Sequence, residues 1–300
     1  MNLDSILLAL IDGVSYGGLL FLVALGLTFI FGVVRVLNVA HGSLYAFGGY
    51  TAATMGIWFA EDADSVWLSI MAVLLGAVIV GLVLGYGLML LLRRFQDRDP
   101  ILQLLVTFGA FMVLEDIQVM IWGTSPYFVS EIMYQMGQSE LLGVVFMNYQ
   151  LLFIPAIALS VFIALSWFLK YSIKGRQIVA VTHNREVATA MGVNAARVSL
   201  LTFVIGATLG ALGGAMASPT TSLVPGVGAE MIVLSFAVVA TAGLGQISGA
   251  LVVALAIGVA RSLSIYFLPV IEVVMPYMIM MAVLLIRPEG LFTVAEARRI

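Results

Sequence analysis

The 300-residue chain contains no cysteine and only two histidines, His41 and His183. Without thiols it can form neither disulfides nor thiolate metal sites. The two histidines belong to no His-x-x-x-His pair and have no cluster of acidic ligands, so we expect no metal site and no cofactor. The nucleophile motif Gly-x-Ser-x-Gly and the Gly-rich phosphate loop ending in Gly-Lys-Ser/Thr are also missing. The sequence therefore predicts no catalytic residue, no ATP hydrolysis by the chain itself and no enzyme.

Charge is also scarce, and this scarcity indicates the class of protein. Only 10% of the residues are charged, 62% are hydrophobic, and the mean hydropathy is +1.15. Soluble domains carry about 25% charged residues. The following stretches lack Asp, Glu, Lys and Arg altogether: residues 13–34, 36–60, 65–92, 141–169, 198–229 and 231–260. Each is longer than the roughly 20 residues that a helix needs to cross the hydrocarbon core, and continuous apolar runs favour helices over a membrane barrel.

The sequence thus predicts an all-α, polytopic helical bundle. We place crossings near residues 12–34, 37–60, 65–92, 101–122, 149–170, 197–217, 230–244, 247–267 and 270–287. Segment 230–244 is short enough to be a half-span. We therefore expect about eight or nine transmembrane segments, with one or two of them broken or re-entrant. Residues 1–300 would form a single transmembrane domain.

The basic residues set the expected orientation. Eleven of the thirteen fall in four places: Arg35, residues 93–98, residues 170–197 and residues 298–299. Acidic segments without bases alternate with them: Asp4, residues 61–64, residues 131–140, Glu230 and Glu272. Since basic loops remain in the cytoplasm, we expect the N-terminus outside and the C-terminus in the cytoplasm. Arg261 is the one base inside a crossing, and we expect it to snorkel to the outer interface.

The cytoplasmic segment 170–197, KYSIKGRQIVAVTHNREVATAMGVNAAR, is too polar to cross and too long for a simple turn. Val187, Ala190 and Met191 follow helical spacing, and Gly192 is suited to end that helix. Asn194 is then placed to cap the next span. The pattern predicts a short cytoplasmic helix whose apolar stripe stays exposed unless another protein covers it.

Part of this segment resembles a known motif. EVATAMG, residues 186–192, is similar to the EAA-x-x-x-G loop of bacterial ABC-importer permeases, with Val187 replacing an alanine. In those permeases the loop forms a coupling helix that docks into the ATPase subunit. The resemblance implies an ATPase-coupling role for a set of residues: Glu186, Val187, Ala188, Met191 and Gly192. An ordinary solvated amphipathic loop is the alternative.

A longer resemblance lies near the N-terminus. ALGLTFIFGVVRVLNVAHGSLYAFGGY, residues 24–50, resembles the signature of the branched-chain amino-acid permease family (LivH-like subunit), with Asn38, Ala40, His41 and Gly42 matching its N-x-A-H-G pattern. Residues 192–214, 242–263 and 287–292 (RPEGLF) also resemble family signatures, so the likeness covers essentially the whole chain. It departs from the family at residues 92–100 and 229–250. If either region shapes the substrate path, the cargo need not be a branched-chain amino acid.

The resemblance implies the permease subunit of an ATP-driven importer in the bacterial inner membrane, taking up a small polar solute such as a branched-chain or related amino acid. Urea, short amides or aromatic acids are alternative cargoes, and an ion-coupled secondary transporter is a rival function. The implied partners are two ATPase subunits, a homologous second permease (LivM-like), an external solute-binding protein and the lipid bilayer. Because the bases lie at membrane ends, no nucleic-acid partner is expected.

Two segments are candidates for the translocation path. The first interrupts the N-terminal apolar region and contributes Asn38, His41, Gly42, Ser43 and Tyr45, with Asn38 suited to cap the following helix. Such a break either borders a substrate path or lies in the headgroup region and simply caps a helix. The second, SPTTSLVPGVGAE at residues 218–230, contributes Ser218, Thr220, Thr221 and Ser222. It either lines an outer entrance or forms an ordinary loop.

Two further features concern the spans themselves. Gly206, Gly210 and Gly214 recur at the spacing that allows close helix contact, so we expect tight packing there. Glu115 and Asp116 lie towards the outer part of the fourth span, where a carboxylate is costly. They either have a functional role or sit in the outer headgroup layer because the span ends before them.

Overall fold

A computed structural model describes residues 3–60, 66–95, 98–141 and 143–292. Their α-helices are α1 (Leu3–Val34), α2 (His41–Ala60), α3 (Val66–Arg93), α4 (Pro100–Trp122), α5 (Glu131–Gln135), α6 (Ile154–Tyr171), α7 (Ile173–His183), α8 (Arg185–Ala190), α9 (Ala195–Ala217), α10 (Val227–Ala242), α11 (Ile247–Phe267) and α12 (Met275–Ile286). The π-helical turn η1 (Tyr149–Phe153) precedes α6, and the 3-10 turn η2 (Pro269–Ile271) precedes α12. Glu61, Asp62, Asp64, Arg298 and Arg299, which contributed to the expected orientation, lie outside the described residues.

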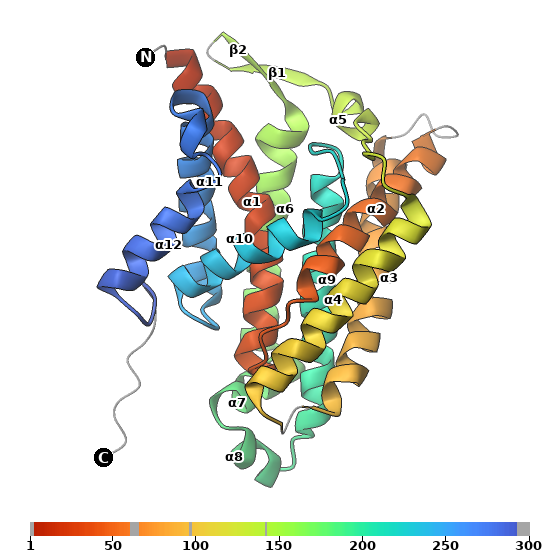
Figure 1. Cartoon of the computed structure of the whole chain (residues 1–300), viewed down its shortest axis with the longest axis vertical. Coiled ribbons are helices and arrows are strands. Elements are labelled where there is room, and N and C mark those ends of the chain that lie inside the picture. Colours follow the sequence, from red (N-terminus) through yellow and green to blue (C-terminus); the bar gives the residue numbers. More distant parts are fainter. Residues whose placement is uncertain (1–2, 61–65, 96–97, 142, 293–300) are drawn as a thin grey trace.

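The prediction of an all-α membrane bundle is confirmed. Among the described residues, six helices are long and apolar enough to cross a membrane: α1, α3, α4, η1 with α6, α9 and α11. The exception to the helical pattern is a small antiparallel hairpin of β1 (Gln138–Leu141) and β2 (Val144–Met147), which the sequence analysis did not foresee. It lies at the end of the molecule where α1 begins (Figure 1).

α1 and α9 form the centre of the bundle. Of the most apolar 18 residues of α1, 89% are buried, whereas the corresponding share for α4 and for α6 is 17%. α1 packs against α6, α9, α10 and α11, and α9 packs against α1, α2 and α3. α4 and α6 therefore lie at the rim, where their apolar side chains are left for lipid or for a partner protein.

Two pairs of helices repeat one arrangement in opposite orientations. α1 runs from the hairpin end of the molecule to the end that carries α7 and α8, and α9 runs the other way (Figure 1). Each is followed by an irregular segment, residues 35–40 or 218–226, and then by a helix that starts inside the bundle, α2 or α10. α1 packs on α11 much as α9 packs on α3. Inverted pairs with broken helices are common in transporters.

α10 is a half-span. Its 16 residues make a helix of about 24 Å, shorter than the roughly 30 Å hydrocarbon core. Figure 1 shows it lying across the bundle rather than along it. Two of its last carbonyls, those of Thr241 and Ala242, accept hydrogen bonds from the backbone N–H groups of Leu291 and Phe292 at 2.9 and 3.0 Å. The RPEGLF segment therefore satisfies backbone groups that a helix end inside a membrane would otherwise leave unpaired.

Candidate functional site

The first candidate segment begins where α1 stops. Arg35 has a φ of 56°, and it is the only non-glycine among the described residues with positive φ. The chain then returns into the bundle in extended form, and a hydroxyl of α4 meets its backbone. Thr107 Oγ1 accepts from the N–H of Val39 at 3.3 Å. Its hydroxyl donates to the carbonyl of Leu104 within α4 at 2.9 Å, with the carbonyl of Leu37 as a longer alternative at 3.3 Å. Non-helical backbone at membrane depth needs such partners. The sequence analysis did not identify Thr107, because this contact joins residues far apart in the chain.

His41, the first residue of α2, is fully buried. Its Nε2 donates to the carbonyl of Val23 at 3.0 Å. The ring fills the space over two glycines, since a Cβ atom would lie 2.9 Å from Cε1 of His41 if added to Gly26 and 2.7 Å from it if added to Gly210. His41 thus lies between α1 and α9 in the protein interior. The structure therefore places His41 inside the bundle, and its place beside a substrate path stays a prediction.

The expectation that Asn38 caps α2 with its side chain is wrong. Its backbone carbonyl accepts the N–H of His41 at 3.2 Å, while both polar atoms of its buried amide have no hydrogen-bond partner in the described part of the chain. The extended return brings the amide into the interior before the helix starts. The Asn38 side chain therefore does not cap α2. Its amide is a buried polar group without a hydrogen-bond partner among the described residues.

The remaining residues of this segment join it to α9 and α10. Gly42 touches Gly228 at the start of α10, and a Cβ on Gly228 would lie 2.7 Å from the carbonyl oxygen of Gly42. Ser43 Oγ donates to the carbonyl of Phe111 in α4 at 3.5 Å. The side chain of Tyr45 interacts with that of Thr221. The two candidate path segments are therefore brought together.

The three glycines of α9 lie along the face of this helix that meets α1 and α2. A Cβ on Gly206 would lie 2.7 Å from the carbonyl oxygen of Gly26 in α1, and Gly210 faces His41. Gly214 lies directly against the carbonyl of Tyr45 in α2. Glycine at these positions allows the helix backbones to approach without a side chain between them.

The loop between α9 and α10 holds the second candidate segment. Ser218 is buried and donates to the carbonyl of Ala215 at 2.9 Å, while Thr220 and Thr221 each donate to that of Ala217 at 3.0 Å. Thr220 and Thr221 also line a cavity, whereas Ser222 is exposed and does not belong to its lining. The segment thus divides into residues that face the cavity, a buried serine and an exposed one.

This cavity, called the outer cavity because the sequence predicts that its end of the bundle lies outside, has a volume of about 310 Å³ and lies beside the first half of α1. It is lined by Asp12, Ser15, Tyr16, Leu19, Gln150, Thr220, Thr221, Arg261, Ser262, Ile265 and Tyr266. Small-molecule sites span about 300–1,000 Å³, so the volume suits a small solute. Both charge signs and several hydroxyls are present, which is an unusual lining for the interior of a membrane bundle.

Arg261 belongs to this cavity, so the expectation that it snorkels to the outer interface is wrong. Its side chain is 18% exposed, with Nη2 lying 3.6 Å from Glu272 Oε1 and 3.9 Å from Glu230 Oε1. Its guanidinium carbon lies 4.4 Å from the centroid of the Tyr16 ring. Glu230, expected in an outer segment, is in the first turn of α10. The sequence does not reveal this cluster because it joins α1, α10, α11 and the residue after η2.

Glu115 and Asp116 lie within α4, and the helix continues beyond them to Trp122. Glu115 is half-buried and Asp116 is exposed. Glu115 Oε1 is 3.8 Å from the point where Gly226 would carry a Cβ. Gly226 precedes the first residue of α10, and a carboxylate near a helix N-terminus is favourable.

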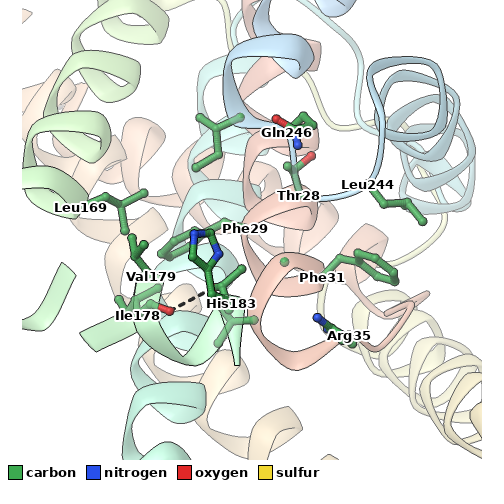
Figure 2. A pocket seen from close by; sticks show the side chains of 15 residues that line it. Thr28, Phe29, Phe31, Arg35, Leu169, Ile178, Val179, His183, Leu244 and Gln246 are labelled. Atoms are coloured by element: carbon green, nitrogen blue, oxygen red, sulfur yellow. Dashed lines mark hydrogen bonds between the residues drawn. The ribbon is translucent and has the colours of Figure 1, made fainter. Parts of the chain in front are cut away.

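A second, inner cavity of about 760 Å³ lies at the opposite end of α1. Figure 2 shows Thr28 and Gln246 on one side of it, His183 near its centre and Arg35 below Phe31. Its walls come from α1, α6, α7 and the α10–α11 turn. That turn is part of one region that departs from the family pattern. On α1 the stretch from Leu20 to Leu25, which separates the two cavities, is fully buried.

Residues 170–197 contain two short helices, α7 and α8. The sequence predicts only α8. Asn184 caps α8 by accepting the N–H of Val187 at 3.0 Å, and Gly192 follows the helix with a φ of 87°. Asn194 caps α9 by accepting the N–H of Arg197 at 3.0 Å. These helix ends agree with the prediction.

The exposed side of α8 is apolar at two positions. Val187 is 57% and Met191 81% exposed, and Glu186 is exposed beside them. Ala188 points inward instead and is buried. α8 lies at the tip of the molecule opposite the hairpin (Figure 1). Val187 and Met191 therefore leave two large apolar side chains exposed at this tip.

Comparison with known proteins identifies the family. The family model described as "Branched-chain amino acid transport system / permease component" matches residues 9–286. The high-affinity branched-chain amino acid transport permease LivH of Salmonella typhimurium is 26% identical, covering 96% of each chain. BraD, the permease of the same description from Pseudomonas aeruginosa, is 26% identical over 97% of each chain. A probable LivH of Methanocaldococcus jannaschii is 28% identical over 93% of this chain and 90% of its own.

Among solved structures, PsaBC from Streptococcus pneumoniae in complex with a Fab covers 95% of this chain and 91% of its own, with a TM-score of 0.47 and 13% identity. That likeness is too weak to bear on the fold. The family model spans nearly the whole chain, and the relatives match it from end to end. The chain belongs to the family of permease components of branched-chain amino acid transport systems.

Proposed function

We propose that the chain is the membrane-spanning subunit of an ATP-driven importer that takes up branched-chain or closely related amino acids into a bacterium. The family assignment supports the permease role, and the names of the relatives, LivH and BraD, support the cargo. The chain itself supplies no chemistry. It contributes different binding energies for the solute in its two conformations, which is how a transporter uses an external energy source.

α8 carries the proposal. It projects from one end of the bundle and leaves Val187 and Met191 in the open, with Glu186 beside them. An ATPase subunit docked on the stretch from Glu186 to Gly192 would cover this patch. Two ATPases act together in such importers, so a second permease, homologous to this chain, would offer the other docking helix. The exposed faces of α3, α4 and α6 are available for its contact and for lipid.

The basic residues of α7 and α8 support an orientation for the chain in the membrane. α7 and α8 with their basic residues lie in the cytoplasm, and the β1–β2 hairpin lies outside with the start of α1. An external solute-binding protein would deliver its ligand near the outer cavity. Thr220, Thr221 and Tyr45 would then border the entrance, and His41 and the three glycines of α9 would hold the helices beneath it.

The test is to purify the chain together with the products of its neighbouring genes after Met191→Asp or Gly192→Asp. A charge in the patch should lower the amount of copurifying ATPase, or its coupling to uptake, by at least about tenfold, as expected when a central apolar contact is lost. Glu186→Ala should weaken coupling in the same assay. Val145→Asp is the matched control, because Val145 is 57% exposed on the hairpin at the other end.

Full ATPase recovery and normal uptake with Met191→Asp would contradict the docking proposal. Solute uptake by the purified chain alone under an ion gradient would instead support a secondary transporter.

A further inference from the structure

The outer cavity presents opposite charges within one small space. Asp12 enters from α1 and Arg261 from α11, and both side chains belong to the lining of the same 310 Å³ volume. Hydroxyl groups of Thr220 and Thr221 lie on the re-entrant loop, and Leu19 and Ile265 add apolar surface. Charged groups inside a membrane bundle are costly and mark solute pathways.

Arg261 has capacity for a further acceptor. Its contacts with Glu272 and Glu230 are 3.6 and 3.9 Å long, whereas charge-assisted hydrogen bonds are about 2.7–2.9 Å. A guanidinium carries five N–H donors in a planar fork that matches a carboxylate with two parallel bonds. The closest contacts to both carboxylates are made by Nη2, and the guanidinium carbon lies 4.4 Å from the centroid of the Tyr16 ring.

Asp12 has a matching capacity of opposite sign. One of its oxygens accepts a hydrogen bond from the Tyr266 hydroxyl at 2.7 Å. A carboxylate offers about four lone-pair sites, so that bond orients the group without using it up. The remaining lone pairs of Asp12 can accept hydrogen bonds from an ammonium group.

A buried serine supplies an independent sign of a ligand. Ser262 is 4% exposed, lines the cavity, and its hydroxyl has no hydrogen-bond partner in the described residues. A buried hydroxyl without a partner costs free energy unless something in the cavity completes it. The side chains of Ser262 and Arg261 line the same cavity.

We propose that the outer cavity is a binding site for the zwitterionic backbone of an α-amino acid, with Arg261 holding the carboxylate and Asp12 the ammonium group. Leu19 and Ile265 then face the aliphatic side chain. The inference rests on the proposed function, because it assigns the residues that bind the amino acid during transport.

The test measures ligand-induced thermal stabilisation of the purified importer complex, without binding protein, using three probes. Leucine carries both charged groups, leucinamide lacks the carboxylate, and 4-methylpentanoate lacks the ammonium group. A ligand that binds only the folded state stabilises it by RT ln(1 + L/Kd), where L is the free ligand concentration, and therefore raises Tm. We expect leucine alone to stabilise the wild-type complex and to lose its effect with Arg261→Gln or Asp12→Asn. Leucine uptake into proteoliposomes should fall by at least about tenfold in both variants.

Glu272→Gln is the matched control, because it removes one ion pair of Arg261 and keeps the guanidinium. It should retain stabilisation by leucine. If Glu272→Gln abolishes the leucine effect as fully as Arg261→Gln does, Arg261 acts through its ion pairs and the assignment is overturned. Unchanged leucine binding in Arg261→Gln, or equal stabilisation by leucine and leucinamide in the wild type, overturns it as well.

Failure of the proposed function has a different signature. An assembled wild-type importer that takes up no branched-chain amino acid would overturn the proposed cargo and, with it, this site. Wild-type leucine uptake with an unaffected Arg261→Gln variant would overturn the site alone.

Discussion

His41 is held by shape more than by polar contacts. Its ring occupies the space that two missing side chains leave, at Gly26 in α1 and Gly210 in α9, and one nitrogen bonds a helix carbonyl that is already part of α1. The histidine and the glycines therefore depend on one another. A side chain on either glycine must displace the ring, and protein interiors tolerate such overpacking poorly.

Gly210→Ala should lower the thermal stability of the chain. The new methyl group would meet the His41 ring at 2.7 Å, and the strain should cost about 1–3 kcal/mol. Gly109→Ala is the matched control in another span, since a Cβ there meets no atom within 4 Å. Alanine favours a helix over glycine by up to about 1 kcal/mol, so the control should be neutral or stabilising. Thermal unfolding in detergent compares the two, and equal Tm values would show that the His41 pocket is loose.

At the residue scale, what the sequence predicts correctly is local. Gly192 and Asn194 act at a helix end, where their neighbours in the sequence define the need. Asn38 and Arg261 were misinterpreted because their surroundings come from elsewhere in the chain. An asparagine ahead of a helix is typical of a cap, yet the return of the chain buries its amide. An arginine near a span end is typical of snorkelling, yet two carboxylates draw it inward.

The stability of α8 depends on the residues at its two ends. It has six residues, fewer than an isolated helix needs in water, and its order depends on the Asn184 cap and on the turn at Gly192. Ala188 anchors it to the rest of the molecule through its buried side. The docking surface is therefore sensitive to changes that do not touch any exposed residue.

Asn184→Ala should uncouple ATP hydrolysis from uptake without altering the exposed patch. Loss of the bond to the N–H of Val187 should cost about 1 kcal/mol and fray the first turn of α8. Asn184→Asp keeps an acceptor at the same place and serves as the control. The measurement is the number of ATP molecules hydrolysed per solute taken up in proteoliposomes. If both variants raise this ratio equally, the cap is not what keeps α8 in register with the ATPase.

At the element scale, long apolar stretches predict the long helices well. Residues 101–122 and 247–267 correspond closely to α4 and α11, and the suspected half-span at 230–244 is α10. The sequence does not predict that α2 starts inside the bundle, because hydropathy does not report how deep in the bundle a residue lies. The β1–β2 hairpin and α7 are missed for a similar reason. Short elements are stabilised by what they pack against, and a single sequence does not show it.

The whole molecule has a different cavity at each end, and a buried stretch of α1 lies between them. The outer cavity lies beside Asp12 to Leu19 of α1 and the inner cavity beside Thr28 to Arg35, with the fully buried stretch from Leu20 to Leu25 between them. From Leu19 at the outer cavity to Thr28 at the inner cavity, α1 rises by about 13 Å. A solute crosses this gap only if helices move. The conformation described here is therefore closed between the two cavities.

Single cysteines should report which end faces outward. Val145 in β2 and Val187 in α8 are equally exposed, at 57%, and lie at opposite ends. Because the chain has no cysteine of its own, the unaltered protein is the background control. A membrane-impermeant maleimide should label Val145→Cys in intact cells, and Val187→Cys only after permeabilisation. The reverse pattern would invert the proposed orientation.

The α1–α2 and α9–α10 units have opposite orientations, and this gives one polypeptide two nearly equivalent conformations. If each unit adopts the backbone arrangement of the other, the opening moves to the opposite face while the same kinds of helix contact are rebuilt. Such an exchange changes the amount of packed surface little, so the two shapes should have similar free energies. A small difference in how strongly partners hold each shape is then enough to reverse the direction in which the membrane domain opens.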